Sequence, residues 1–325
     1  MELNFLSKLV NSNGISSNEE RVRDLIEKEI KNYVDEIYID KIGNLVAHKK
    51  GSKPTVMLAA HMDEVGLMIK KIQGNKVYFS AIGGVNAKKI IGSKVCIEGF
   101  KRECIVRKKG KIKKDKDKAK NLFIVLNKKE LKQAKIGSYC NLVGNFQLRR
   151  NIISGKALDD RTGCYILIEL AKKLKILKAK NEIYFVFTVQ EEIGLYGARV
   201  SAYKINPDYA IAVDVTTYEK GTRELGKGPC ITVKDERMIG NRCINGWLQE
   251  IADKNKIPLQ LDVTDEGTTD ASVISLTKEG IPATAIGPAV QDIHTTKSQA
   301  HQQDINNTIR LLELLLIKPP LKCVI

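Results

Sequence analysis

The sequence of 325 residues predicts a three-layer α/β domain that carries a small all-β insertion. A continuous apolar run from Thr55, TVMLAAHMD, is typical of a strand buried on both faces of a parallel sheet. From about residue 151 strands and helices alternate, as in α/β folds. Between residues 67 and 150 the sequence has only short β-like pieces punctuated by glycine. We therefore expect one discontinuous catalytic domain, 1–66 with 151–325, and an inserted β domain, 67–150.

The first predicted elements precede the insertion. Ser17 and Glu20 form a capping-box pattern, which predicts the start of a helix that carries apolar residues at helical spacing from Val22 to Ile30. Short apolar runs bounded by turn residues then predict three strands: EIYID, NLVAH after Gly43, and the run from Thr55. The third strand ends in polar residues at its carboxyl end, which is where open α/β sheets bind ligands.

After the insertion, helices and strands alternate along the sequence. The predicted helices cover residues 162–174, 195–204, 240–254, a segment from about 270, and 303–317. The predicted strands are EIYFVFTV at 182–189, DYAIAVDV at 208–215 and ATAIG at 283–287. Because the chain before the insertion also combines helices with apolar strands, we expect both parts to share one sheet.

The net charge of +16 is concentrated in one segment. Residues 101–120 hold eleven Lys/Arg against three Asp/Glu, which is half of the whole excess. This segment has no aromatic residue for base stacking and fits no nucleic-acid-binding motif, so a solvated loop is the simpler interpretation. For substrates, the overall charge gives only a faint preference for acidic peptides.

Several classes of protein are disfavoured by composition. The seven cysteines include no Cys-x-x-Cys pair, which argues against a disulfide framework and a structural zinc site. No run approaches the roughly 20 apolar residues that a membrane span needs. The first residues, MELNFLSKLV, lack the features of a secretory signal, so we expect a cytoplasmic protein.

Five places put polar residues at the ends of apolar strands or at the start of a helix. They are His61 with Asp63, Asp159 with Asp160, Glu191 with Glu192, Asp214, and His294. Taken singly, each has an ordinary structural explanation; two aspartates, for example, suit the first turn of a helix. Two adjacent glutamates at a buried strand end, however, are costly without nearby cations. Together the residues suit two ions of Zn or Co, with Mn also compatible, about 3.5–4 Å apart and sharing a water.

At this point the sequence resembles a known family. The motifs AAHMDEVG, GKALDDRTGC, TVQEEIGLYGA and AIAVDV, followed by the His294 loop, resemble the TET-type metallo-aminopeptidases, which include glutamyl aminopeptidases. The resemblance covers nearly the whole chain and implies a dinuclear enzyme that removes N-terminal residues from peptides. Carried over by position, it implies that His61 and Asp214 hold one metal ion, that Glu192 and His294 hold the other, and that Asp159 bridges them.

The resemblance also implies roles around the metals. Glu191 would be the general base that takes a proton from the attacking water and passes it to the leaving amine. Asp63 would orient His61, and a cis peptide bond would join Asp159 to Asp160. The inserted domain would mediate dimer contacts, and the dimers would assemble into a tetrahedral dodecamer that admits peptides. One departure from the family is Asp292, which stands where relatives carry an aromatic residue.

Two other functions stay open on the sequence alone. The first is a metal-independent, endoglucanase-like glycosidase that acts through paired carboxylates; it is disfavoured because adjacent residues of a strand, such as Glu191 and Glu192, point to opposite faces. The second is a module that binds nucleic acid or an acidic partner through residues 101–120. The preferred N-terminal residue, the physiological metal and the choice between dimer and dodecamer also stay open.

Overall fold

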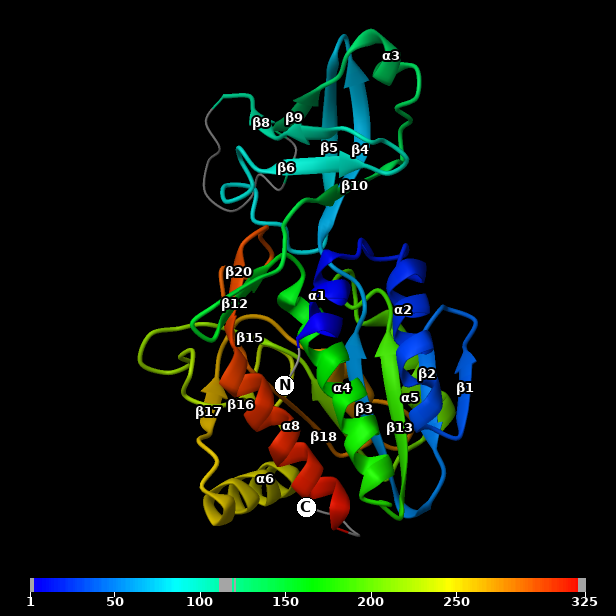
Figure 1. Ribbon diagram of the computed structural model, residues 1–325, viewed down its shortest axis with the longest axis vertical. Helices are drawn as coiled ribbons and strands as arrows, with labels where there is room; N and C mark the ends of the chain where they lie inside the picture. Colours follow the sequence, from blue (N-terminus) through cyan, green and yellow to red (C-terminus); the bar gives the residue numbers. More distant parts are fainter. Residues whose placement is uncertain (1–2, 111–118, 120, 321–325) are drawn as a thin grey trace.

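The computed structural model describes residues 3–110, 119 and 121–320. Part of the basic segment predicted to be a solvated loop, 111–118 and 120, lies outside the described residues. Within these limits the central sheet has eight strands (Figure 1), in the order β1 (Glu36–Ile39), β2 (Leu45–Lys49), β13 (Asn181–Thr188), β3 (Ser52–His61), β14 (Tyr209–Val213), β18 (Ala283–Gly287), β16 (Cys230–Lys234) and β17 (Gln260–Val263). Strands β13, β3, β14 and β18 are parallel neighbours. The expectation of one sheet built from both sides of the insertion is confirmed.

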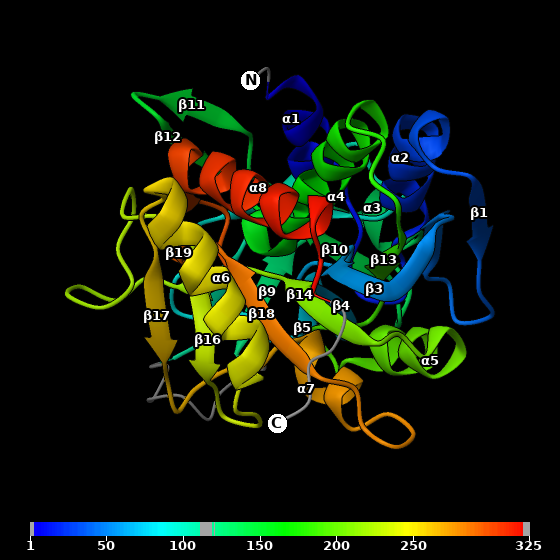
Figure 2. The ribbon, with the colours of Figure 1, turned by 90° about the horizontal axis from the view of Figure 1, so that it is seen from below.

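Helices cover both faces of this sheet (Figure 2), which confirms the three-layer α/β fold. In β3, Val56 and Leu58 face one core and Met57 and Ala59 the other, as the alternation of a doubly covered strand requires. The first core is shared with α1 (Asn4–Asn11), α2 (Glu20–Ile30), α4 (Leu158–Ile176), α6 (Arg242–Asn255) and α8 (Gln302–Ile317). The second core is shared with α5 (Tyr196–Ile205) and α7 (Asp270–Ser275).

A second sheet projects from one end of the molecule (Figure 1). Its seven strands among the described residues are, in order, β7 (Glu103–Ile105), β6 (Lys94–Ile97), β10 (Tyr139–Leu142), β4 (Gly66–Gln73), β5 (Lys76–Ile82), β9 (Leu122–Val125) and β8 (Arg107–Lys108). It has a hydrophobic core of its own and one short helix, α3 (Lys128–Leu131). The predicted β-rich insertion is therefore present, whereas its sequence boundaries stay a prediction.

A third, smaller sheet joins the two larger parts. It contains β11 (Gln147–Arg149), β12 (Ile152–Gly155), β20 (Ser298–His301), β19 (Ala289–Gln291) and β15 (Thr216–Thr217). Strand β11 falls inside the range predicted for the insertion but pairs with β12. Strands β19 and β20 flank the loop that carries His294, so this sheet fixes both ends of that loop.

The start of the second helix differs from the prediction. Ser17 has φ of +71°, and the residue that precedes α2 is Glu19, whose side chain accepts the Ser17 N–H at 2.8 Å. The capping-box prediction is therefore wrong: Ser17 lies in a left-handed turn before the helix instead of capping it. The helix η1 (Lys31–Tyr33) extends α2, and α1 was not predicted.

None of the helices described is both long enough and apolar enough to cross a bilayer.

Candidate metal centre

The predicted site residues converge at the carboxyl end of the central sheet. His61 ends β3, and its register partner in β13 is Thr188, so the segment after β13 starts beside His61. Asp214 follows β14 directly. One cavity of about 420 Å³ is lined by His61, Asp159, Glu191, Glu192, Asp214 and His294. Because parallel strands end at the same edge, motifs far apart in sequence meet there.

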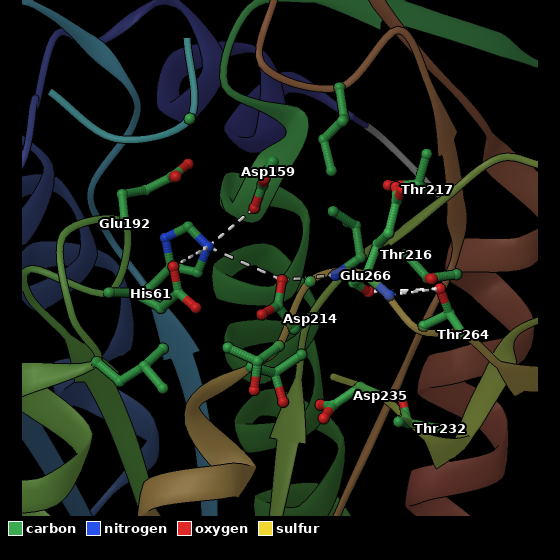
Figure 3. Close-up of a pocket in the computed structure, with 18 of the residues that line it drawn as sticks. His61, Asp159, Glu192, Asp214, Thr216, Thr217, Thr232, Asp235, Thr264 and Glu266 are labelled. Atoms are coloured by element: carbon green, nitrogen blue, oxygen red, sulfur yellow. Dashed lines mark hydrogen bonds and ion pairs between the residues drawn. The ribbon is translucent and has the colours of Figure 1, made fainter. Parts of the chain in front are cut away.

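The first group of side chains surrounds one oxygen of Asp159. His61 Nε2 lies 2.8 Å from Asp159 Oδ1 and 3.8 Å from Asp214 Oδ1 (Figure 3). One ligand atom from each of these three residues lies within 4.8 Å of the others. Glu191 is adjacent, with Oε2 at 3.9 Å from His61 Nε2.

The second group surrounds the other oxygen of the same carboxylate. His294 Nε2 lies 2.9 Å from Asp159 Oδ2 and 3.2 Å from Glu192 Oε1. These three residues also bring one ligand atom each to within 4.8 Å of the others. Asp159 therefore belongs to both groups. It is joined to Asp160 by a cis peptide bond, as expected.

Both histidine rings are oriented by backbone carbonyls. His61 Nδ1 lies 3.1 Å from the carbonyl oxygen of Asp63, and His294 Nδ1 lies 3.1 Å from that of Gly84. A carbonyl only accepts, so each Nδ1 donates, and Nε2 is the nitrogen that faces Asp159 and would bind a cation. Gly84 follows β5, so the seven-stranded sheet contributes to the site, which the sequence did not indicate.

Asp63 makes more contacts than the predicted one with His61. Its carboxylate lies 3.5 Å from His61 Nδ1, but its oxygens also accept the N–H groups of Glu191 at 3.0 Å and Glu192 at 3.2 Å, and the Ser16 hydroxyl at 2.6 Å. Asp63 thus fixes the backbone that carries both glutamates. The expectation that these glutamates point to opposite faces of a strand is wrong, because they lie beyond β13 and both line the cavity.

Burial and mutual repulsion dominate the electrostatics. Burial raises the pKa of Glu191 well above its usual value despite the attraction of His61, and the charge of Asp214 raises it further. Burial likewise raises the pKa of Asp214. For Asp159, burial is outweighed by the hydrogen bonds from His294 and His61, which lower its pKa.

The donor set fits divalent cations. Imidazole nitrogen and carboxylate oxygen together suit Zn, Co and Mn. Glu192 Oε1 is buried and lacks a hydrogen bond, although it lies near His294. So many carboxylates in one buried place are costly unless cations neutralise them.

Sequence reasoning gave no role to two further buried carboxylates. Asp270 accepts the Thr188 hydroxyl at 2.6 Å through Oδ2, while its Oδ1 has no hydrogen-bond partner. Burial raises the pKa of Asp270 to about 6. Asp235 lines the cavity on the side of β16. In the sequence each lies in a polar run that looks like an ordinary turn.

Known proteins are similar to this chain over nearly its whole length. The model of the family described as M42 glutamyl aminopeptidase matches residues 43–311. A protein of Acetivibrio thermocellus named "Putative aminopeptidase" is 41% identical over 95% of this chain and 96% of its own. The "Lysyl aminopeptidase" of Pyrococcus furiosus is 34% identical over 97% of each chain. The solved structure of the Pyrococcus horikoshii TET1 peptidase superposes with a TM-score of 0.86, at 31% identity, over 97% of this chain and 99% of that one.

Proposed function

The chain belongs to the M42 glutamyl aminopeptidase family and is a metal-dependent aminopeptidase, and we propose that it acts through two divalent cations held on either side of Asp159. His61 and Asp214 complete the first site, and Glu192 and His294 complete the second. The observation that carries this proposal is the pair of contacts from Asp159, 2.8 Å to His61 and 2.9 Å to His294, one through each oxygen. A carboxylate that bridges two cations has to present one oxygen to each of them.

The chemistry then divides between ions and side chains. When bound, the cations would polarise the scissile carbonyl and lower the pKa of the attacking water. Glu191 takes the proton from that water and delivers it to the leaving amine. Its position supports this role, because it lines the cavity beside His61 and is not needed as a ligand. Asp63 acts as a positioning residue, since it holds the N–H groups of both glutamates.

The metal identity is proposed from the donors. Two imidazoles and three carboxylates favour Zn or Co, with Mn also compatible, over the all-oxygen shells of Ca. Glycosidase activity and nucleic-acid binding are not favoured, because family and site both point to peptide hydrolysis.

The experiment is peptide hydrolysis with and without metal. The purified chain should release N-terminal residues from peptides with a free amino group but not from the same peptides after acetylation. Exhaustive chelation should abolish release, and Zn, Co or Mn added in turn should restore it. Sugar hydrolysis that survives chelation, or peptide hydrolysis that does, would contradict the proposal.

We also propose an assembly through the insertion. The P. horikoshii TET1 peptidase is described as able to form a tetrahedron or a large octahedral shell. By analogy, this chain forms homodimers through the seven-stranded sheet, and the dimers build a dodecamer. Mass measurement in solution distinguishes a dimer from a dodecamer. We also propose that the protein is cytoplasmic.

Relatives do not agree on the residue removed. The family description names glutamyl substrates, whereas the P. furiosus relative is named for lysyl substrates. The N-terminal residue that this chain prefers therefore has to be inferred from the side chains that line its own cavity.

A further inference from the structure

We propose that the free edge of strand β15 (Thr216–Thr217) binds the main chain of the substrate peptide beyond the scissile bond, as one added parallel strand. This inference rests on the proposed function, because it concerns the substrate of that same cavity. It assigns a surface to the peptide chain, and it does not depend on which N-terminal residue is removed.

Strand β15 is an edge strand that lies in the wall of the cavity. It is the last strand of the five-stranded sheet, where β19 is its one neighbour among the described residues. Thr216 and Thr217 both line the cavity that contains the metal centre, and Thr217 is exposed. Figure 3 shows both threonines on the far side of Asp214 from His61. An edge strand presents main-chain groups with which another extended chain can pair.

The strand order places the free edge of β15 on the side of the metal centre. In the eight-stranded sheet, β14 lies between β3 and β18. The chain continues from β14 into β15 and from β18 into β19, and β15 pairs with β19 in parallel as β14 pairs with β18. Strand β3, on the other side of β14, ends at His61. The edge of β15 that β19 leaves open therefore faces the space beyond His61, where the substrate has to bind.

The main-chain hydrogen bonds of this segment alternate between its two edges. The Thr216 N–H donates to the carbonyl oxygen of Pro288 at 3.1 Å, and the Tyr218 N–H donates to that of Val290 at 2.9 Å, both on the side of β19. Successive residues of a strand turn their N–H and C=O groups to opposite edges, so Thr217 directs its pair to the free edge. The Thr217 N–H can donate to a carbonyl of the peptide, and its C=O can accept an N–H from a later residue.

The direction of β15 matches that of a bound peptide. The strand leads away from Asp214, a proposed metal ligand, to Thr217. A substrate whose N-terminal residue is removed at the metal centre also leads away from it, so the two chains run parallel. Three residues of strand span roughly 10 Å, so Thr217 should pair with main-chain groups among the third to fifth residues of the peptide.

A buried ion pair holds this edge in place before a peptide binds. Thr216 Oγ1 donates to Asp262 Oδ2 at 2.7 Å, and Arg223 Nη1 donates to the other oxygen of the same carboxylate at 2.6 Å. Arg223 and Asp262 are only 7% and 3% exposed. Because these contacts fix the strand in advance, less conformational entropy is lost when a peptide pairs with it.

The first test uses the full-length, metal-loaded enzyme and two kinds of substrate. A coumarin amide of one amino acid has no main chain beyond the scissile bond, whereas a pentapeptide with the same N-terminal residue has one. Thr217→Pro removes the N–H at the free edge and leaves the N–H groups that donate towards β19, and proline is tolerated at such edge positions. The ratio of kcat/KM for the pentapeptide to that for the amide should fall about fivefold. Thr217→Val, the matched control, keeps the N–H and should retain the ratio.

A second measurement uses the unmodified enzyme, so it does not depend on the folding of a variant. Pentapeptides are compared in which the main-chain N–H of the third, fourth or fifth residue is replaced by an ester oxygen. One of these replacements should lower kcat/KM about fivefold, because the Thr217 C=O loses its donor.

Two failures have different meanings. If neither coumarin amides nor pentapeptides are hydrolysed with Zn, Co or Mn, the proposed function is contradicted. If both are hydrolysed, three results would each overturn this inference while the proposed function stands. They are an equal loss for amide and pentapeptide in Thr217→Pro, a fall of the ratio in Thr217→Val as large as in Thr217→Pro, and no effect of the ester at any position.

Discussion

The two ligand groups around Asp159 are built in different ways. His61 and Asp214 stand at the ends of adjacent parallel strands, and the His61 side chain is only 2% exposed. Glu192 and His294 stand on loops; the His294 side chain is 24% exposed, and its φ of +60° is uncommon for a residue other than glycine. Strand register fixes the first group, whereas the second depends on contacts between loops and the seven-stranded sheet. We therefore expect the first site to bind its ion more tightly.

The largest effect should separate the two adjacent glutamates. Glu191→Gln removes the proposed base but no ligand, so turnover should fall by about 10²–10⁴-fold while both ions stay bound. Glu192→Gln removes a ligand of the second group and should lower its metal content. Steady-state kinetics with metal analysis of each variant distinguishes these cases. Full turnover in Glu191→Gln would show that another group takes the proton.

The comparison itself is tested by the two histidines. His61→Ala should weaken binding of the first ion by more than about 100-fold, since even partners outside the ligand shell contribute 10–100-fold. His294→Ala should cost less, because water can enter the more exposed second group and replace the ring. Titration against a chromogenic chelator gives both affinities. Equal losses would mean that the difference in burial has no consequence for binding.

The candidate ligands of both groups can be predicted from the sequence, because His61, Glu192 and Asp214 follow continuous apolar strands and His294 lies just past another. Their division between two ions cannot be predicted from the pattern and came from the family resemblance, for all five ligands alike. Gly84 acts through its backbone carbonyl, which leaves no signal in residue type or spacing.

A smaller effect is expected where the seven-stranded sheet meets the second group. A Cβ at Gly84 would lie 2.8 Å from His294 Nδ1, so Gly84→Ala must move the ring that Gly84 orients. Affinity for the second ion should fall about tenfold, with the first ion unaffected. Gly246→Ala is the control, since a Cβ there meets nothing within 4 Å. If Gly84→Ala leaves the affinity for the second ion unchanged, the contact from the seven-stranded sheet does not contribute to metal binding.

The smallest effect concerns the loop that carries the glutamates. Glu19 accepts the Gln190 N–H at 3.0 Å, and burial, followed by the charge of Asp63, raises the pKa of Glu19 to about 7. Its native pKa exceeds the unfolded value of 4.5, so the stability it contributes is present at low pH and is lost as pH rises through about 7. In metal-free protein, Glu19→Gln should lose less stability than the wild type between pH 5 and pH 8, by on the order of 1 kcal/mol. Urea unfolding at both pH values measures this difference, and identical pH dependence would contradict it.

The most direct test of the two-ion account is anomalous diffraction from a zinc-loaded crystal. The account predicts two peaks, one beside Asp159 Oδ1 with His61 and Asp214, and one beside Oδ2 with Glu192 and His294. A single peak, or a second ion that does not contact Asp159, would contradict it.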